Sequence, residues 1–170
     1  MTMVASVKVE GFEDLFKRMD ELRDEIGKGK TDRIWRKALG VAFQPVLDAA
    51  KSAAPKDTGQ LADHLYMKVQ KPQNRDKSSK YYDGEMYMAR VTVNPKRDDT
   101  KVRTVLNKRG KFQNISTHRP VALALEFGTA SNPAKPFLRP ALESNSQKVM
   151  EILGNELRLA IDKIAEGKKG

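Results

Sequence analysis

Few residues of this 170-residue chain are of the types that catalyse reactions or bind metals. There are two histidines, His64 and His118, and no cysteine. Neither histidine has a carboxylate three or four residues further along a helix turn, which is the spacing of helical metal ligands. The absence of thiols excludes disulfides, cysteine-based zinc sites and thiol nucleophiles. Serine-nucleophile elbows, phosphate-binding loops and dinucleotide-binding glycine motifs are absent as well. We therefore expect no enzyme activity, no metal site and no cofactor.

One carboxylate stands in an unusual place. Glu126 lies between Leu125 and Phe127 in the most apolar stretch of the chain. It could be a buried ion-pair partner that sets the orientation of subunits, because a buried carboxylate requires a partner and several arginines are available. It could equally be an outward-facing residue on an element with alternating polarity. The sequence leaves both interpretations open.

Basic residues are the other candidates for function. The net charge is +10 and the sequence pI is about 9.8, which favours nucleic acid, an acidic protein surface or an anionic membrane as a neighbour. The excess is concentrated in the middle third of the chain. The segment 96–119 carries the partner-contacting candidates Lys96, Arg97, Lys101, Arg103, Lys108, Arg109, Lys111 and Arg119.

Three interpretations fit this basic arm: a solvated loop, an arm that contacts protein, and a contact with the backbone of duplex DNA. Aromatic residues are scarcely interleaved with the charges, and no helix-turn-helix or zinc-finger signature is present, so base-specific recognition is not expected. Between the two partners, we favour an acidic protein face on a neighbouring subunit over DNA, because pairing with acidic side chains would fix subunit register.

The helices that must position these residues are visible as periodic patterns. Apolar residues at steps of three and four predict an amphipathic helix from Phe12 to Ile26, ended by residues 27–30. A second, alanine-rich helix is expected from an N-cap at Thr31 to about Ala53, with a kink at Pro45. A third stripe predicts a long last helix over 138–165.

Strands are expected over 64–70 and 85–93, where β-forming residues alternate, with a polar connector between them. Residues 102–106 could form one more short strand, and 120–128 could be a buried strand or a short helix. The fold class is therefore α+β: a small, mostly antiparallel sheet packed against two or three helices, including a long C-terminal helix, with a long basic loop. We expect a single domain over 1–170, with its core in 4–70, 84–93 and 120–165, a basic loop insertion at 94–119 and a flexible tail at 166–170.

The chain is also expected to be soluble. No run approaches the ~18 consecutive apolar residues of a membrane helix, and no apolar stretch follows the N-terminus as in a signal peptide. Membrane partners are therefore not expected.

Three segments together resemble the tail-completion and neck proteins of long-tailed bacteriophages (siphophages). The first is the alanine-rich stretch 49–61, which ends in a P-x-D-T-G-x-L pattern. The second is an E-F-G-T pattern and the third, over 133–142, is similar to P-A-x-P-F-L-R-P-A-L. The motif residues are Pro55, Asp57, Thr58, Gly59, Leu61, Glu126, Phe127, Gly128, Thr129, Pro136, Phe137, Leu138, Arg139 and Pro140. Their order and spacing fit the family, as does the opening 9–12, and the stretch 71–119 is poorly covered.

The resemblance implies a structural virion protein. It implies a homo-oligomeric ring, hexameric like the tail tube, at the head-proximal end of the tail. There the ring would complete or terminate the tube and support head–tail joining, with the tail tube protein and head connector proteins as partners. Non-specific contact with DNA in the lumen is possible at this position, and the protein would pass from the host cytoplasm into the virion. The alternative is a basic accessory protein that binds the duplex DNA backbone without sequence specificity.

Overall fold

The computed structural model describes residues 13–55, 60–80, 82, 86–93, 102–106, 108–116 and 118–167. The chain divides into two compact units, Met1–Pro45, Met67–Arg90 and Asn145–Gly170 forming unit 1, and Val46–Tyr66 and Val91–Ser144 forming unit 2. Several helices and strands contribute residues to both units, so the expectation of one domain stays a prediction.

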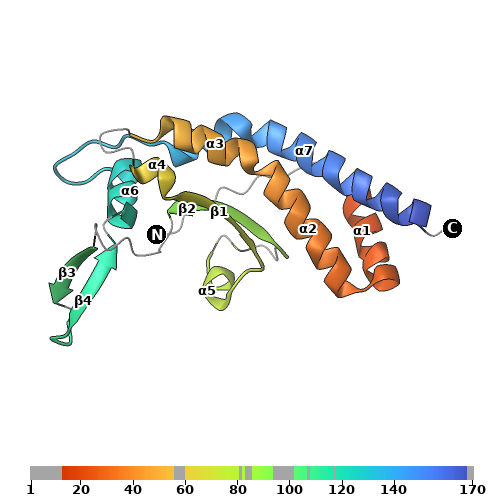
Figure 1. Cartoon of the computed structure of the whole chain (residues 1–170), viewed down its shortest axis with the longest axis horizontal. Coiled ribbons are helices and arrows are strands. Elements are labelled where there is room, and N and C mark those ends of the chain that lie inside the picture. Colours follow the sequence, from red (N-terminus) through yellow and green to blue (C-terminus); the bar gives the residue numbers. More distant parts are fainter. Residues whose placement is uncertain are drawn as a thin grey trace. The chain divides into compact units, whose positions relative to one another are not determined.

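The first predicted helix is confirmed as α1 (Glu13–Ile26), which buries Met19 and Leu22 and lies beside α2 (Figure 1). Helix α2 (Lys28–Ala42) begins three residues earlier than expected. Gly27 alone separates the helices, because its φ of 83° turns the chain and its carbonyl already accepts the N–H groups of Lys30 and Thr31. The N-cap prediction for Thr31 is therefore wrong: this residue lies inside the first turn, where its hydroxyl donates to the Gly27 carbonyl at 3.3 Å.

The predicted kinked helix over 31–53 is two helices. Helix α2 ends at Ala42 and is followed by its C-cap, Phe43, whose N–H donates to the Leu39 carbonyl; α3 (Gln44–Ala53) starts at the next residue. Pro45 is the second residue of α3, a position whose N–H would have no acceptor within the helix. The proline therefore begins a helix instead of bending one.

Strands β1 (Leu65–Gln70) and β2 (Met88–Val93) pair with each other, as the alternating patterns predicted. Between them, one-turn helix α5 (Asn74–Lys77) lies in the polar connector and is closed by reciprocal bonds between Gln73 and Asp76. A further single turn, α4 (Gln60–Asp63), precedes β1 and buries Leu61.

The long basic loop is the part of the expected architecture that the structure does not show. Strands β3 (Val102–Leu106) and β4 (Phe112–Ser116) form an antiparallel hairpin within it, with Leu106 opposite Phe112 (Figure 1). Gly110, with a φ of 70°, lies in the connection between them. The short strand at 102–106 is thus confirmed, whereas residues 94–101 of the predicted loop lie outside the described residues.

The last two helices are α6 (His118–Phe127) and α7 (Leu138–Gly167). Helix α6 resolves the open choice for 120–128 in favour of a helix, with Pro120 in its first turn. Helix α7 confirms the long C-terminal helix, and its apolar stripe buries Ala141, Val149, Leu153 and Leu157. The predicted α+β class is therefore confirmed, and none of the helices in the described ranges is long and apolar enough to cross a membrane.

Candidate functional site

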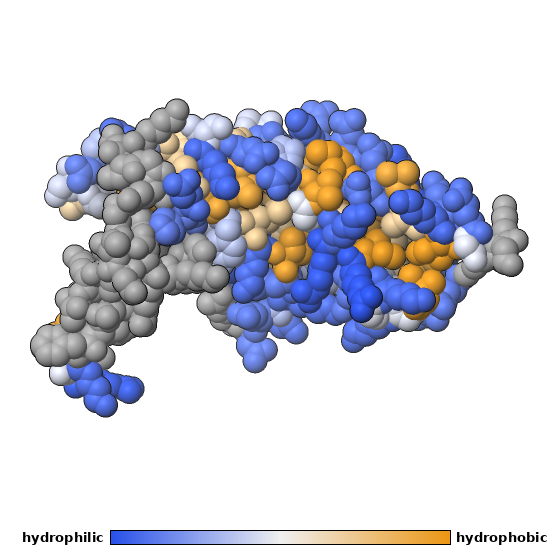
Figure 2. Space-filling model, in the orientation of Figure 1, coloured by the Kyte–Doolittle hydropathy of each residue, from blue (hydrophilic) through white to orange (hydrophobic). Residues whose placement is uncertain are grey.

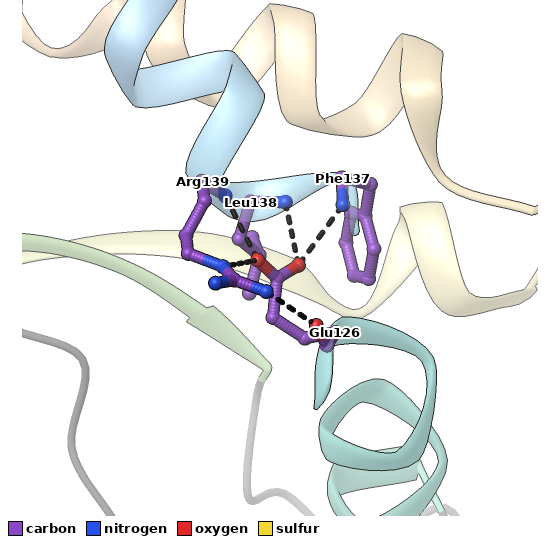
Figure 3. A network of polar contacts seen from close by, with 4 residues as sticks. All are labelled: Glu126, Phe137, Leu138 and Arg139. Carbon is purple, nitrogen blue, oxygen red and sulfur yellow. Dashed lines mark hydrogen bonds and ion pairs between the residues drawn. The ribbon is translucent and has the colours of Figure 1, made fainter. Parts of the chain in front are cut away.

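A densely bonded polar site of unit 2 joins the end of α6 to the start of α7 (Figure 3). Glu126, only 1% exposed, directs its carboxylate at three consecutive backbone N–H groups. Oε2 accepts from Phe137 and Leu138 at 2.9 Å each, and Oε1 accepts from Arg139 at 3.1 Å. We call this arrangement, made by residues 126–129 and 137–140, the α6–α7 clasp.

The clasp solves a problem that every helix start presents. The first N–H groups of an α-helix have no acceptor within the helix. At α7 these groups belong to Phe137, Leu138 and Arg139, and the fourth residue, Pro140, has no N–H to satisfy. A carboxylate at this end is also favoured by the helix dipole. Glu126 therefore caps α7 completely, although it belongs to another helix.

Arg139 makes the connection reciprocal. Its Nε donates to Glu126 Oε1 at 3.0 Å, and its Nη2 donates to the Glu126 backbone carbonyl at 2.8 Å, one of the last carbonyls of α6. The Lys135 N–H donates to the neighbouring Leu125 carbonyl at 2.7 Å. The guanidinium also lies over the Phe127 ring, 5.3 Å from its centroid. Each helix thus supplies groups that satisfy the end of the other.

The electrostatics of Glu126 follow from these bonds. Burial of the carboxyl opposes ionisation, but the backbone N–H groups of Leu138 and Phe137 and the Arg139 side chain outweigh it and hold the pKa below its ordinary value of 4.5. The carboxylate is therefore ionised at neutral pH, which is the form that accepts all four hydrogen bonds.

The loop between the two helices requires a glycine. Gly128 has a φ of 74°, and a Cβ there would lie 3.0 Å from the Ala134 nitrogen and 3.1 Å from the Asn132 oxygen, both backbone atoms. Thr129 folds the following turn, because its Oγ1 accepts from the Asn132 N–H at 3.1 Å and its own N–H donates to the Asn132 carbonyl. The whole E-F-G-T pattern therefore has a structural explanation.

The structure brings two of the three sequence motifs together. Phe137 is 1% exposed and anchors the clasp, while Pro136 and Pro140 are exposed. Of the two interpretations of Glu126, the buried ion pair is observed and the outward-facing residue is not. Its partner, Arg139, belongs to the same chain, and a role in orienting subunits stays a prediction. In the first motif, Pro55 is half-buried and Leu61 is buried, whereas Asp57, Thr58 and Gly59 lie outside the described residues.

The basic arm is partly visible. Lys108, Arg109 and Lys111 are exposed in the connection between β3 and β4, Arg103 lies on β3 and Arg119 on α6. Lys96, Arg97 and Lys101 lie outside the described residues. Contact of this arm with a partner stays a prediction.

Helix α6 has an inverted polarity that sequence reasoning missed. Its only carboxylate, Glu126, is buried, while Val121, Leu123 and Phe127 are 49%, 41% and 42% exposed. Leu123 and Phe127, four residues apart, share one side of the helix, and Val121 lies on another side. We call these three exposed side chains together the α6 outward face. A helix that is apolar on all sides is normally covered on all sides. The signal was hidden because an apolar run of this length does not distinguish a strand from a helix.

Separate apolar patches within a mainly hydrophilic surface are visible on the side of the molecule drawn in Figure 2. One half-covered apolar residue, Phe16 of α1, packs on the ring of Trp35 with centroids 5.5 Å apart. Trp35 in turn stacks on Tyr87 at 5.7 Å. These rings belong to a second cluster, in unit 1, that the sequence did not suggest.

In this second cluster, Asp32 of α2 accepts hydrogen bonds from Lys71 at 2.6 Å and from the Tyr87 hydroxyl. The bonds from Lys71 and Tyr87 lower the pKa of Asp32, whereas burial and the bond to Asp32 raise the pKa of Tyr87 to about 12. The cluster ties the end of β1 and the start of β2 to α2. Within the described ranges, no group of three or more histidine, aspartate or glutamate residues is placed to hold a metal ion.

Comparison with known proteins places this architecture. A family model described as "Bacteriophage HK97-gp10, putative tail-component" matches residues 13–128, about two thirds of the chain. The match runs from the start of α1 to the glycine of the E-F-G-T pattern, so α7 and the third motif lie beyond it. No curated protein and no solved structure gave a significant match to the chain.

Proposed function

Because the chain belongs to the HK97-gp10-like family of bacteriophage tail components, we propose that it forms a ring at the head-proximal end of the tail. In this position it completes or terminates the tail tube and supports joining to the head. As a tail component the protein is part of the virion; its assembly from the host cytoplasm belongs to the proposal.

The observation that carries the proposal, besides family membership, is the α6 outward face. Three large apolar side chains on one ten-residue helix are exposed in the isolated chain. Exposed apolar area of this kind marks protein contacts, because burying it against a partner contributes about 25 cal/mol of binding free energy for each Å². A ring subunit must offer such contacts to its neighbours, whereas a freely diffusing protein has no need of them.

The proposed mechanism is stoichiometric binding without catalysis. The ring is hexameric, to match a sixfold tube, and its two faces bind the tail tube protein and the head connector. Support comes from the order and spacing of the three sequence motifs, two of which build the α6–α7 clasp. A rigid clasp suits this role because it fixes how α6 is presented.

A phage that lacks the reading frame tests the proposal. Electron microscopy of lysates should show filled heads separate from tails, and tails whose head-proximal end is open or irregular in length. Supplying the chain in trans should restore joined particles. Normal joined virions in the absence of the chain would contradict the proposed function.

A further inference from the structure

Helix α2 presents a basic side to solvent. Its buried residues Thr31, Trp35, Ala38 and Ala42 recur at steps of three and four and mark the side that packs inside unit 1. On the opposite side, at the same helical spacing, lie Gly29, Lys30, Arg33, Arg36, Lys37 and Gly40. We call these six residues the α2 basic face. All four of its charged side chains are exposed.

The sequence around these charges does not balance them. No carboxylate lies three or four residues from Lys30, Arg33 or Lys37, which is the distance at which opposite charges pair along a helix. Asp32, four residues before Arg36, is the one carboxylate of α2, and it already accepts the hydrogen bonds of the second cluster. Helix α1, with its six carboxylates, contacts the buried side of α2 through the pair of rings described above. Like charges at these spacings oppose helix formation, so the stability of α2 does not explain them.

The two glycines of the face have no packing explanation either. Glycine inside a helix lowers its stability relative to alanine. A Cβ at Gly29 or at Gly40 would nevertheless meet no atom of a neighbouring element within 4 Å. A glycine between exposed basic side chains lets a ligand approach the helix backbone closely. Both glycines lie in this position, because Gly29 precedes Arg33 by four residues and Gly40 follows Lys37 by three.

The composition of the face indicates the chemistry of its partner. Protein interfaces have an apolar centre and a polar rim, and lysine is depleted in them. In the α2 basic face this order is reversed, because charges and glycines form the centre and the exposed apolar side chain of Val41 lies at the border, four residues after Lys37. Surfaces that bind DNA are more polar and much more positively charged than protein interfaces. A row of cations on one rigid helix suits a partner whose negative charges recur at short, regular intervals, as the phosphates of a duplex do.

From these observations we infer that the α2 basic face binds the phosphate backbone of duplex DNA. Contacts to phosphates carry no base sequence information, and a protein held by them slides along the duplex. Such a contact is compatible with passage of DNA through the proposed ring. The inference goes beyond the proposed function and does not depend on it, because each single chain carries the whole face.

Removal of the four charges tests the site. One variant carries Lys30→Gln, Arg33→Gln, Arg36→Gln and Lys37→Gln, which keeps residues of good helix propensity. Binding of the purified full chain to a labelled duplex is measured by fluorescence anisotropy at several salt concentrations. Four phosphate contacts contribute about −3.6 to the slope of log K against log salt, which is a loss of affinity of about a hundredfold between 50 and 200 mM salt. The variant should therefore bind at least about tenfold more weakly at low salt, with a slope shallower by about 3 to 4.

A matched control separates net charge from position. Arg18→Gln, Lys148→Gln, Arg158→Gln and Lys163→Gln remove the same charge from exposed helical positions, each with a carboxylate three or four residues away. This control should bind the duplex within about twofold of the wild type. Circular dichroism verifies that both variants are folded. Poly-L-glutamate is the second probe, and the wild type should bind it at least about tenfold more weakly than the duplex, because its negative charges are less dense.

Four outcomes overturn the inference. The wild type does not bind the duplex even at low salt, or the α2 variant binds it as tightly as the wild type. The control loses as much affinity as the α2 variant, so that net charge and not the face determines binding. The wild type binds poly-L-glutamate as tightly as DNA, so that the face is suited to the carboxylates of a protein partner. None of these outcomes affects the ring, because the ring is tested by counting joined particles in lysates and not by DNA binding.

Discussion

Replacing Glu126 by glutamine should destabilise the protein far more than removing a typical ion pair. The amide keeps the shape of the side chain but leaves one oxygen in place of two. An NH₂ group then faces either the Phe137 and Leu138 N–H groups or the two donors of Arg139. In both orientations, two donors lose their acceptor.

The magnitude follows from burial. A hydrogen bond to a charged group contributes about 1.5–3 kcal/mol. In one orientation the amide loses the bonds from the Phe137 and Leu138 N–H groups, of which the Phe137 bond is buried. In the other orientation it loses the two part-buried bonds from Arg139. The hydrogen bonds from the Leu138 and Arg139 N–H groups are only part-buried, which reduces the loss below the full value for two buried bonds. We expect Glu126→Gln to lower the free energy of unfolding by about 3 kcal/mol.

Arg139→Ala is the matched comparison. Its side chain is 44% exposed, so its ion pair with Glu126 is worth at most about 1 kcal/mol after solvent screening. The three backbone donors keep their acceptor in this variant, and we expect a loss of about 1–2 kcal/mol.

Urea unfolding followed by circular dichroism at pH 7 measures both variants. A loss below about 0.5 kcal/mol for Glu126→Gln, or a larger loss for Arg139→Ala than for Glu126→Gln, would refute the capping role of Glu126.

The remaining predictions concern pH, the loop, the second cluster and the α6 outward face. Because the folded-state pKa of Glu126 lies below its ordinary value of 4.5, the stability that its carboxylate contributes is present above pH 4.5 and disappears as the pH falls through the folded-state pKa. The difference in free energy of unfolding between the wild type and Glu126→Gln should therefore shrink in acid. A constant difference down to pH 2 would contradict the lowered pKa of Glu126. Gly128→Ala should lower the melting temperature clearly more than Gly110→Ala, since both have positive φ but only Gly128 lacks room for a Cβ; equal losses would show that the clasp loop is not tightly packed. Absorbance titration should find a tyrosine that ionises near pH 12, and Tyr87→Phe should remove this transition. Because burial and the bond to Asp32 raise the pKa of Tyr87 from 10 to about 12, the free energy of unfolding of the wild type should fall as the pH rises from 10 to 12. An equal alkaline fall in the Tyr87→Phe chain would contradict this. Val121→Asp combined with Leu123→Asp should abolish incorporation into tails. The double substitution should change the free energy of unfolding by less than about 0.5 kcal/mol, because both positions are exposed. Normal incorporation would show that the α6 outward face does not contact another protein.

Local patterns in the sequence predicted the elements whose cause is local. The period of α1 and the stripe of α7 come from apolar residues at helical spacing, and both helices are where that spacing put them. The start of α2 was predicted less accurately, because the Gly27 carbonyl already accepts the hydrogen bonds that the Thr31 side chain was expected to accept as N-cap. Pro45 was misread for a related reason: a proline has the same appearance in sequence whether it bends a helix or begins one.

Contacts between distant segments were not predictable in the same way. The motifs named Glu126 and Arg139, but their meeting requires a turn whose geometry depends on Gly128. Lys71 and Tyr87 follow Asp32 in the sequence by 39 and 55 residues, and no rule of sequence spacing predicts that they bind it. The hairpin was hidden by its low apolar content, since its strands are held by backbone hydrogen bonds that any sequence can make.

Reconstruction of the head–tail junction by electron cryomicroscopy tests the central claim most directly. We expect a closed ring of this chain at the head-proximal end of the tail tube. A junction in which the chain is absent, or in which it is distributed along the tube without closing a ring, would contradict the account.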